Sequence, residues 1–450
     1  MISQEPQFFD GVKLSKRHFI LLFLIAGAIF FDQMDNFNFG FMAPYMKQSS
    51  LQLSDEVIGQ ILGLYFVGML AGGLLSGPLS NRIGRKGTYL FSVLVFSVFS
   101  ICSGLAPTAL LFMVFRTLTG LGIACFVVAC FPYLIEMLPQ ESRGKWATRV
   151  SAIGLIGVPV VGIMCRMILP LDPEAWRIIA IVGGFGLLFF VLGIFLLDES
   201  PRWLVSKGRE EEAAKVLERM TGRKFNPEQL KGTVAPLGQT LNAKGEKITG
   251  LKVLGEAFSK KFLKRTLVLG TIYMLLTVSS FVFLSWAPTL MDGRGYDPSI
   301  IALAIAFGIP IGAFVASFVA EKGGRKVPMV CFAGFIAFLA LGFAFGTAEL
   351  LVVAIVFLIT GSINGFSVIF FAYTPENYPI HLRATMNGIL WSSGRALTAI
   401  VQPLIPLIYA TIGFTALFCV MGAIFLIASL LLGLFGIKTS GKSLEEISDE

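Results

Sequence analysis

Long apolar blocks separated by short polar loops constrain the fold of this chain more than any other feature. A helix of roughly 20 apolar residues spans the hydrocarbon core of a membrane. Only 14% of the 450 residues are charged, whereas soluble domains use about 25% charged residues to cover their surface. We therefore predict an all-α polytopic membrane protein with twelve transmembrane helices. These helices are expected to begin near His18, Glu56, Gly87, Thr108, Gly144, Trp176, Phe262, Ser299, Val327, Glu349, Arg383 and Gly413.

Basic residues are concentrated in alternate loops, which predicts the orientation of the chain. Lys and Arg near short loops stay on the cytoplasmic side during insertion, so we expect both termini in the cytoplasm. The net charge of +8 has this origin and does not indicate a nucleic-acid partner. The other loops carry only Lys47, Arg166, Arg177 and Arg294. The basic set is Lys13, Lys16, Arg17, Arg82, Arg85, Lys86, Arg143, Lys145, Arg149, Lys322, Arg325, Lys326, Arg383 and Lys438.

One long polar stretch divides the apolar blocks into two groups of six. We predict an N-terminal six-helix bundle at 1–197, a cytoplasmic linker at 198–261, a C-terminal six-helix bundle at 262–437 and a cytoplasmic tail at 438–450. Within the linker, Glu210 to Met220 has Ala213, Val216 and Leu217 on one side, which is typical of an amphipathic helix.

The two halves share motifs at one constant offset. Tyr133, Glu136, Pro139 and Arg143 follow the fourth block, and Tyr373, Glu376, Pro379 and Arg383 follow the tenth, a shift of 373 − 133 = 240. The same shift relates Gly84-Arg85-Lys86 to Gly324-Arg325-Lys326. Such repeats predict two pseudo-symmetric bundles with a solute site at mid-membrane.

Two stretches combine glycine and basic residues at fixed spacings. Gly77 to Lys86 reads Gly, three residues, Asn, Arg, one residue, Gly, Arg, Lys, and the fourth span carries Arg116, Gly120 and Gly122. Both resemble motifs of the major facilitator superfamily, although Asn81 replaces the Asp of its loop motif, so the latch formed there is expected to be weaker or organised by Glu136. The stretch Glu199 to Trp203 resembles sugar porters and organic-ion transporters.

Three further motifs resemble the bacterial niacin-transporter and synaptic-vesicle-protein-like group. They are Phe31 to Asp35, Tyr373 to Pro379, and Arg383 to Thr385 with Gly394-Arg395. The resemblance implies the major facilitator fold, alternating access and the inner membrane of a bacterium.

Four ionisable residues lie inside apolar blocks, where a charge costs at least about 2.5–3.5 kcal/mol. Asp32 and Asp35 share one helix face, so repulsion and burial favour proton uptake by one of them. In sugar-porter-like proton symporters an Asp of the first span faces an Arg of the fourth. The resemblance therefore implies that Asp35 is the proton site and Arg116 its electrostatic switch; a permanent structural ion pair is the alternative. Asp32 is a proton site, a solute contact or a solvated residue at the mouth of the cavity.

Arg395 is the fourth ionisable residue inside an apolar block, and its planar guanidinium matches the geometry of a carboxylate group. In organic-ion transporters that this chain resembles, an Arg here accompanies anionic substrates; pairing with a protein acid is the alternative. Trp286 is an interfacial anchor or a cavity wall, and Asn364 and Gln402 bind solute or join helices. The predicted substrate-binding residues are Arg395, Phe37, Tyr65, Tyr273, Trp286, Asn364, Trp391 and Gln402.

A third set of charges is predicted to form inter-helix salt bridges that close a cytoplasmic gate. The gate residues are Arg82, Arg85, Glu136, Arg143, Arg325, Glu376 and Arg383.

These residues favour a monomeric secondary transporter in the cell membrane. We predict proton-coupled symport of a small organic acid, such as an aromatic or pyridine carboxylate. A proton-antiporting exporter of drugs or metabolites and a non-transporting receptor are the alternatives. No phosphate-binding loop or metal cluster is evident in the sequence, so we expect neither an enzyme nor a cofactor. The expected partners are an anionic organic solute, protons and the lipid bilayer.

Overall fold

The structure is a computed structural model, and it describes residues 8–9, 11–233, 240–241, 247–248, 255–256, 258–260, 262–320, 324–378 and 380–436. The side chains of residues 240, 241, 247, 248, 380, 381 and 384 are not part of this description. Pro379, Lys322, Lys438, the predicted tail and parts of the predicted linker therefore lie outside the described residues.

Helices account for nearly all regular structure in the described part of the chain. The one pair of strands, β1 (Thr240–Leu241) and β2 (Lys247–Ile248), is antiparallel and two residues long in each strand. The helices are α1 (Lys16–Met46), α2 (Asp55–Gly104), α3 (Ala109–Met137), α4 (Gln140–Leu155), α5 (Gly157–Ile168), η1 (Leu169–Leu171), α6 (Trp176–Gly183), η2 (Gly184–Gly186), α7 (Leu187–Leu196), α8 (Pro201–Ser206), α9 (Glu210–Thr221), α10 (Pro227–Leu230), α12 (Leu263–Asp292), α13 (Pro298–Val319), α14 (Lys326–Phe345), α15 (Glu349–Glu376), α16 (Ile380–Val401), η3 (Gln402–Leu404) and α17 (Ile405–Phe435).

Ten helical stretches among the described residues are long and apolar enough to cross a membrane. Two of them, of 50 and 51 residues, are each interrupted by one non-helical glycine. Gly84 has φ 88° and Gly413 has φ 76°, a backbone region that favours glycine. Division at these two residues gives 10 + 2 = 12 spans, so the prediction of twelve transmembrane helices is confirmed.

Large apolar side chains are exposed along these spans. Phe195, Phe338 and Leu350 are 77%, 70% and 84% exposed. A soluble protein rarely leaves so much apolar surface uncovered, whereas a helix in a bilayer presents such side chains to lipid. The protein is a multi-pass membrane protein.

The contacts of the chain define two compact units. Unit 1 contains Met1–Asn36, Val67–Gly157 and Ala180–Gln239, and unit 2 contains Phe37–Phe66, Val158–Ile179 and Thr240–Glu450. The last part of α1, the first part of α2, and α5 with the start of α6 therefore belong to the same unit as the C-terminal half. The predicted bundle boundaries at 197 and 262 stay a prediction.

Small residues allow two helices to approach closely at equivalent places in each unit. In unit 1, a Cβ atom at Gly68 or Gly72 would overlap backbone atoms of α3. In unit 2, a Cβ atom at Gly308 would crowd the backbone of α15, and one at Gly312 would overlap it. Since 308 − 68 and 312 − 72 both equal 240, the internal repeat is present in helix packing as well as in sequence.

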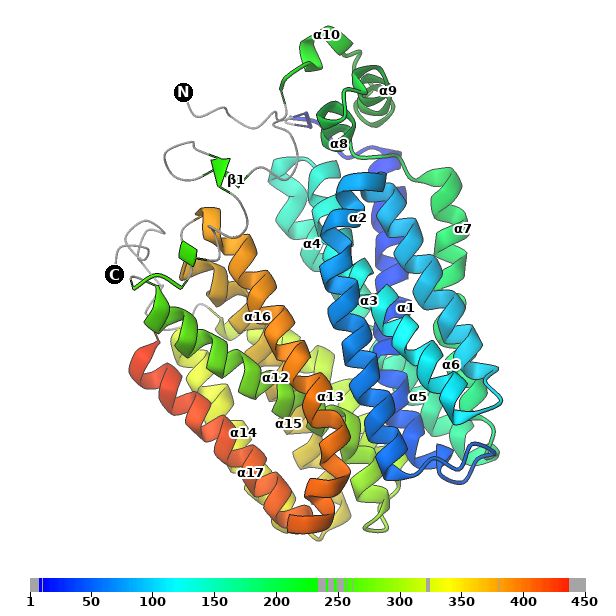
Figure 1. The fold of residues 1–450 in the computed structure, drawn as a ribbon, viewed down its shortest axis with the longest axis vertical. Coiled ribbons are helices and arrows are strands. Elements are labelled where there is room, and N and C mark those ends of the chain that lie inside the picture. Colours follow the sequence, from blue (N-terminus) through cyan, green and yellow to red (C-terminus); the bar gives the residue numbers. More distant parts are fainter. Residues whose placement is uncertain are drawn as a thin grey trace. The chain divides into compact units, whose positions relative to one another are not determined.

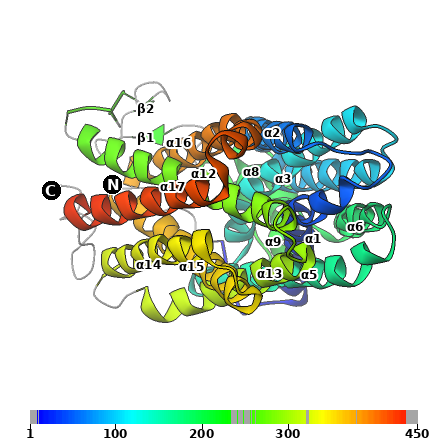
Figure 2. The same cartoon turned by 90° about the horizontal axis from the view of Figure 1, so that it is seen from below.

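In unit 2, α13 lies beside α15, α14 lies beside α15 and α17, and α12 lies beside α16 and α17 (Figures 1 and 2).

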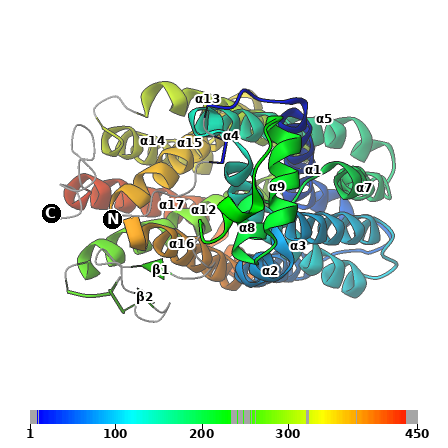
Figure 3. The same cartoon turned by 90° about the horizontal axis from the view of Figure 1, so that it is seen from above.

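The predicted amphipathic helix is present in unit 1 as α9. Its apolar residues Ala213, Val216, Leu217 and Met220 are buried, and it lies against α8 (Figure 3). It ends at Gly222, whose φ of 72° is a common helix C-terminal conformation.

Candidate functional site

A fully buried ion pair joins α1 to α3 in unit 1. Arg116 Nη1 lies 3.0 and 2.9 Å from the two carboxylate oxygens of Asp35, and Arg116 Nη2 donates to the Asp35 carbonyl at 3.2 Å. The side chains are 1% and 0% exposed. A buried charge without its partner costs about 3–5 kcal/mol, so either charge strongly requires the other. The structure thus brings together the two residues that the sequence pairs as proton site and switch.

Ser100, on α2, lies between this pair and the backbone of α6. Its Oγ is 2.5 Å from Asp35 Oδ1 and 2.9 Å from the carbonyl oxygen of Ala180. A hydroxyl group carries one proton, so it donates to one of these oxygens at a time. Ser100 donates to an ionised Asp35. A protonated Asp35 would instead donate to Ser100, which would then donate to Ala180. The direction of this hydrogen bond therefore depends on whether Asp35 holds a proton.

Asp32 lies one turn away on the same helix and is also buried, at 1% exposure. Its Oδ2 accepts a hydrogen bond of 2.9 Å from the side-chain amide of Gln33. This neutral donor differs from the guanidinium that faces Asp35, so the two acids have different surroundings.

Arg395 lies among aromatic rings in unit 2. Its guanidinium carbon is 5.5 Å from the ring centre of Phe66, 4.4 Å from that of Phe281 and 4.8 Å from that of Trp391. These rings come from α2, α12 and α16. Gly394 packs against the ring of Tyr273, which brings a second predicted residue to the same region. The ring faces stabilise the cation, and the half-buried side chain keeps part of its surface accessible. We call Arg395 with Phe66, Phe281 and Trp391 the arginine cage.

The other predicted substrate-binding residues are distributed over unit 2. Trp286 is 1% exposed and donates from Nε1 to Gln402 Oε1 at 2.6 Å, so these two residues join α12 to η3. Asn364 Oδ1 is buried and accepts no hydrogen bond from the described residues. Phe37 and Tyr65 contact Phe41 and Phe66, their respective neighbours.

Two of the predicted gate ion pairs are present at repeat-related positions. Arg85 Nη2 lies 2.8 Å from Glu136 Oε1 in unit 1, and Arg325 Nη2 lies 2.7 Å from Glu376 Oε1 in unit 2. Ser200 also donates to Glu136, at 2.5 Å.

The remaining predicted gate arginines bind backbone carbonyls or face outward. Arg143 Nε donates to Leu138 at 2.7 Å, and Arg383 Nε donates to Tyr378 at 2.9 Å, again 240 residues apart. Arg82 is exposed.

Glu199 has a role at this end of unit 1 that the sequence did not assign. Its Oε1 accepts backbone N–H groups of Arg85, Lys86 and Ser200 at 2.8, 3.1 and 2.8 Å. It thereby caps the helical segment that begins after the break at Gly84, where helix N–H groups have no other partner. Burial raises the pKa of Glu199, and these N–H donors oppose that rise.

A second set of contacts in unit 2 was also missed. Arg166, at the end of α5, lies 2.7 Å from Asp297 Oδ2 and 2.9 Å from Ser299 Oγ at the start of α13. In the same unit, Cβ atoms at Gly59 and Gly63 of α2 would crowd backbone atoms of Pro403 and its neighbours. These contacts hold segments of the N-terminal half against the C-terminal half inside one compact unit. The charge of Arg166 at the edge of an apolar block was the available signal.

Among the described residues, no group of three His, Cys, Asp or Glu side chains is placed to hold a metal ion.

Twelve apolar spans that contain a buried carboxylate–guanidinium pair and a caged arginine define a membrane transporter of the major facilitator type.

The comparisons with known proteins give the family. Residues 22–450 match the family model described as "Sugar (and other) transporter", so the chain belongs to that family of the major facilitator superfamily, as its motifs predict. YyaJ of Bacillus subtilis, named as a metabolite transport protein, is 30% identical over 97% of this chain and 96% of its own length.

Two relatives from Acinetobacter baylyi have named substrates. The niacin transporter NiaP is 25% identical over 97% of this chain and 98% of its own length. The 4-hydroxybenzoate transporter PcaK is 28% identical over 86% of this chain and 83% of its own length.

The fold is similar to that of the xylose transporter XylE from E. coli in its inward open conformation. The TM-score is 0.77 at 18% identity, over 96% of this chain and 99% of XylE. This likeness supports the major facilitator fold.

Proposed function

We propose that this protein imports a small organic anion together with a proton, by alternating access. The observation that carries the proposal is the buried pair of Asp35 and Arg116. Neither charge is exposed, so protonation of Asp35 would remove the negative charge that faces Arg116 inside the membrane. That state is costly, and rearrangement of the helices around Arg116 relieves the cost. Proton binding and conformational change are thereby coupled.

Co-transport of a proton also answers an energetic problem. A monoanion that enters a cell against a negative interior loses about 2.3 kcal/mol per 100 mV. One proton moved with each monoanion makes the step electroneutral and removes this penalty. The pair of Asp35 and Arg116 is more deeply buried than that of Glu136 and Arg85, which favours Asp35 as the site of a single proton per solute.

The arginine cage supports an aromatic carboxylate as the solute. A guanidinium binds a carboxylate with two parallel hydrogen bonds, and the rings of Phe281 and Trp391 offer apolar faces beside it. Niacin and 4-hydroxybenzoate, the substrates named for two relatives, both combine an aromatic ring with a carboxylate group. The chemistry of Arg395 and the names of these relatives therefore favour the same solute class.

The two ion pairs Arg85–Glu136 and Arg325–Glu376 fit a gate at the cytoplasmic ends of the helices, since both follow loops of the basic set. Arg166 and Asp297 fit a second closure at the opposite ends. We propose that the protein is a monomer in a bacterial inner membrane with both termini in the cytoplasm, and that it has no enzymatic activity.

The test is uptake of radiolabelled benzoate, 4-hydroxybenzoate and nicotinate into proteoliposomes with an imposed pH gradient. We expect accumulation of one of these solutes of about tenfold per pH unit, acid outside, because one proton moves per solute. Asp35→Asn should exchange solute across equal concentrations but not concentrate it. Arg395→Lys should lower affinity by roughly tenfold or more, since a lysine cannot form the paired hydrogen bonds.

Accumulation by wild-type protein that is indifferent to the pH gradient would refute the coupling. Proton-driven depletion of the vesicles or cells would indicate the antiporting exporter instead. Binding without flux for every solute would indicate a receptor with a transporter fold.

A further inference from the structure

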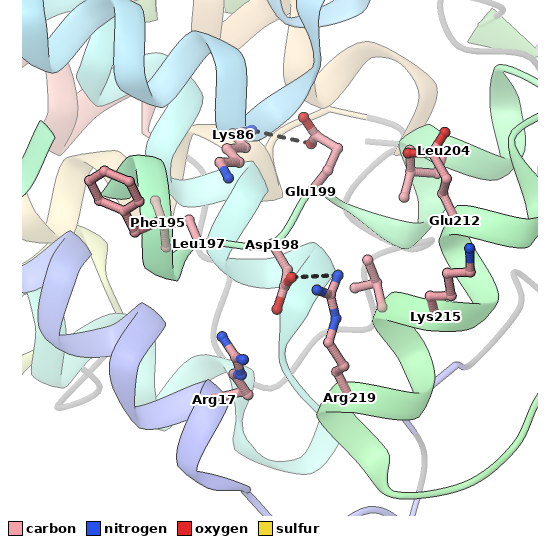
Figure 4. Close-up of a pocket in the computed structure, with 11 residues that line it drawn as sticks. Arg17, Lys86, Phe195, Leu197, Asp198, Glu199, Leu204, Glu212, Lys215 and Arg219 are labelled. Atoms are coloured by element: carbon pink, nitrogen blue, oxygen red, sulfur yellow. Dashed lines mark hydrogen bonds and ion pairs between the residues drawn. The ribbon is translucent and has the colours of Figure 1, made fainter. Parts of the chain in front are cut away.

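A cavity of about 480 Å³ lies in unit 1 where α1, α2 and α7 meet the linker helix α9 (Figure 4). Asp35 and Arg116 are not among the residues that line it. Four of its lining residues are basic: Arg17, Lys86, Lys215 and Arg219. The apolar residues Phe195 and Leu197 also line it, and Figure 4 shows them near Lys86. The cavity thus combines cations from three helices with an apolar margin.

Three acids also line this cavity, and each already has partners. Asp198 lies 2.7 Å from Arg219 Nη2. Glu212 lies 2.6 Å from Nη2 of Arg209, a residue that does not line the cavity. Glu199 accepts the backbone N–H groups described above. Asp198 and Glu212 therefore form ion pairs with Arg219 and Arg209, and the charge of Lys215 also acts on Glu212.

Within the described part of the chain, the other three cations of the cavity form no ion pair with a carboxylate. Lys86 donates to the carbonyl of Ile194, at 2.9 Å, which fixes its ammonium group at the end of α7. Arg17 is half-buried at the start of α1, and Lys215 is exposed on α9. Figure 4 shows Arg17 and Arg219 extending toward Asp198 from opposite elements. One anion in this cavity would face cations from both the bundle and the linker.

The apolar margin indicates which anion would fit. Phe195 is 77% exposed at the end of an apolar span, where a lipid chain would run. A basic pocket at such a place is suited to a phosphate headgroup, and arginine and lysine are the residues that bind phosphate. We propose that this cavity is a binding site for an anionic phosphate ester, with Arg17, Lys86 and Lys215 as its ligands, and that the bound phosphate ties α9 to the helical bundle.

Two sources supply this chemistry, an anionic phospholipid headgroup and a soluble phosphate ester. The test measures the thermal unfolding midpoint of the purified full chain in detergent. The added probes are phosphatidylglycerol, phosphatidylcholine, glycerol 3-phosphate and inorganic phosphate. We expect phosphatidylglycerol to raise the midpoint by about 2 °C or more relative to phosphatidylcholine, because a ligand that binds only the folded state stabilises it.

The variants are Arg17→Gln with Lys215→Gln, compared with Lys224→Gln as the control. Lys224 is an exposed cation of the same linker that does not line the cavity. The double variant should lose the shift and the control should keep it. If the double variant unfolds at a lower temperature without lipid, Lys215→Gln alone serves, since this side chain is exposed.

Each outcome decides the proposal or its source. A shift with phosphatidylglycerol alone assigns the site to lipid, and a shift with glycerol 3-phosphate or inorganic phosphate assigns it to a soluble anion. The proposal is overturned if no anionic probe exceeds phosphatidylcholine, or if the variants keep the full shift.

Discussion

Replacement of Ser100 by alanine tests the coupling at Asp35 most directly. The variant removes one hydroxyl that lies 2.5 Å from Asp35 Oδ1 and leaves the 2.9 Å contact with Arg116 in place. An ionised Asp35 then loses a charge-assisted hydrogen bond. A protonated Asp35 loses only a neutral acceptor, so the ionised form loses more.

The magnitude follows from this difference. A hydrogen bond to a charged group contributes about 1.5–3 kcal/mol and one between neutral groups about 0.5–1.5 kcal/mol. The net change of roughly 1–1.5 kcal/mol corresponds to about one pH unit, at 1.36 kcal/mol per unit. Because the proposed cycle needs a protonated Asp35, uptake should remain active to a pH about one unit higher than in the wild type.

The assay is initial uptake of the transported aromatic carboxylate at external pH from 5 to 9. Ser100→Thr keeps the hydroxyl and should restore the wild-type profile. Ser103→Ala is the matched control, since Ser103 is buried on the same helix but donates to its own helix at Phe99, 2.8 Å away.

A Ser100→Ala variant that loses activity equally at every pH would refute the reasoning. That result would mean that the hydroxyl only holds helices together. An unchanged profile in a folded, active variant would likewise separate Ser100 from the proton step.

Three further predictions concern packing, titration and the second closure. Gly312→Ala should lower the unfolding temperature by several degrees, because its Cβ would overlap the backbone of α15, whereas Gly77→Ala meets nothing within 4 Å and should change it little. Burial raises the pKa of Glu199, so its ionised form is disfavoured in the folded state. The stability of the wild-type protein should therefore fall as pH rises through that pKa. In a plot of unfolding temperature against pH, Glu199→Gln should reduce this fall. Arg166→Gln should shift the equilibrium between the states with this closure open and closed by at most about fivefold. The reason is that the pair with Asp297 is half-exposed, and such pairs contribute about 0–1 kcal/mol. The labelling rate of a cysteine introduced at Ser299 would detect the shift.

The sequence predicted the features that depend on the cost of burying charge or exposing apolar surface. Twelve apolar blocks indicated membrane spans, and the cost of a buried charge, together with the family resemblance, favoured Asp35 and Arg116 as partners. The repeat predicted the geometry at matched positions as well. The ion pairs of Arg85 and Arg325 are 2.8 and 2.7 Å long, and Gly84 and Gly324 have φ of 88° and 81°.

Other features could not be predicted because many residues share the same local signal. Ser100 differs in no local respect from Ser103, yet one faces Asp35 and the other its own helix. Phe66 and Phe281 are two of 42 phenylalanines, and only the packing of α2, α12 and α16 places them around Arg395. Arg166 and Asp297 are 131 residues apart, so no local pattern relates them.

The placement of the buried charges explains why the coupling proposal centres on α1. Asp35 and Asn36 end the first segment of unit 1, and Phe37 begins the first segment of unit 2. The same helix therefore carries the acid that pairs with Arg116 and continues directly into the segment whose Gly40 packs against Ser285 of α12. In the proposed cycle, a change in the charge of Asp35 would act on a helix whose residues belong to both units. A proton site in the middle of either unit would lack this connection, so the position of Asp35 matters as much as its chemistry.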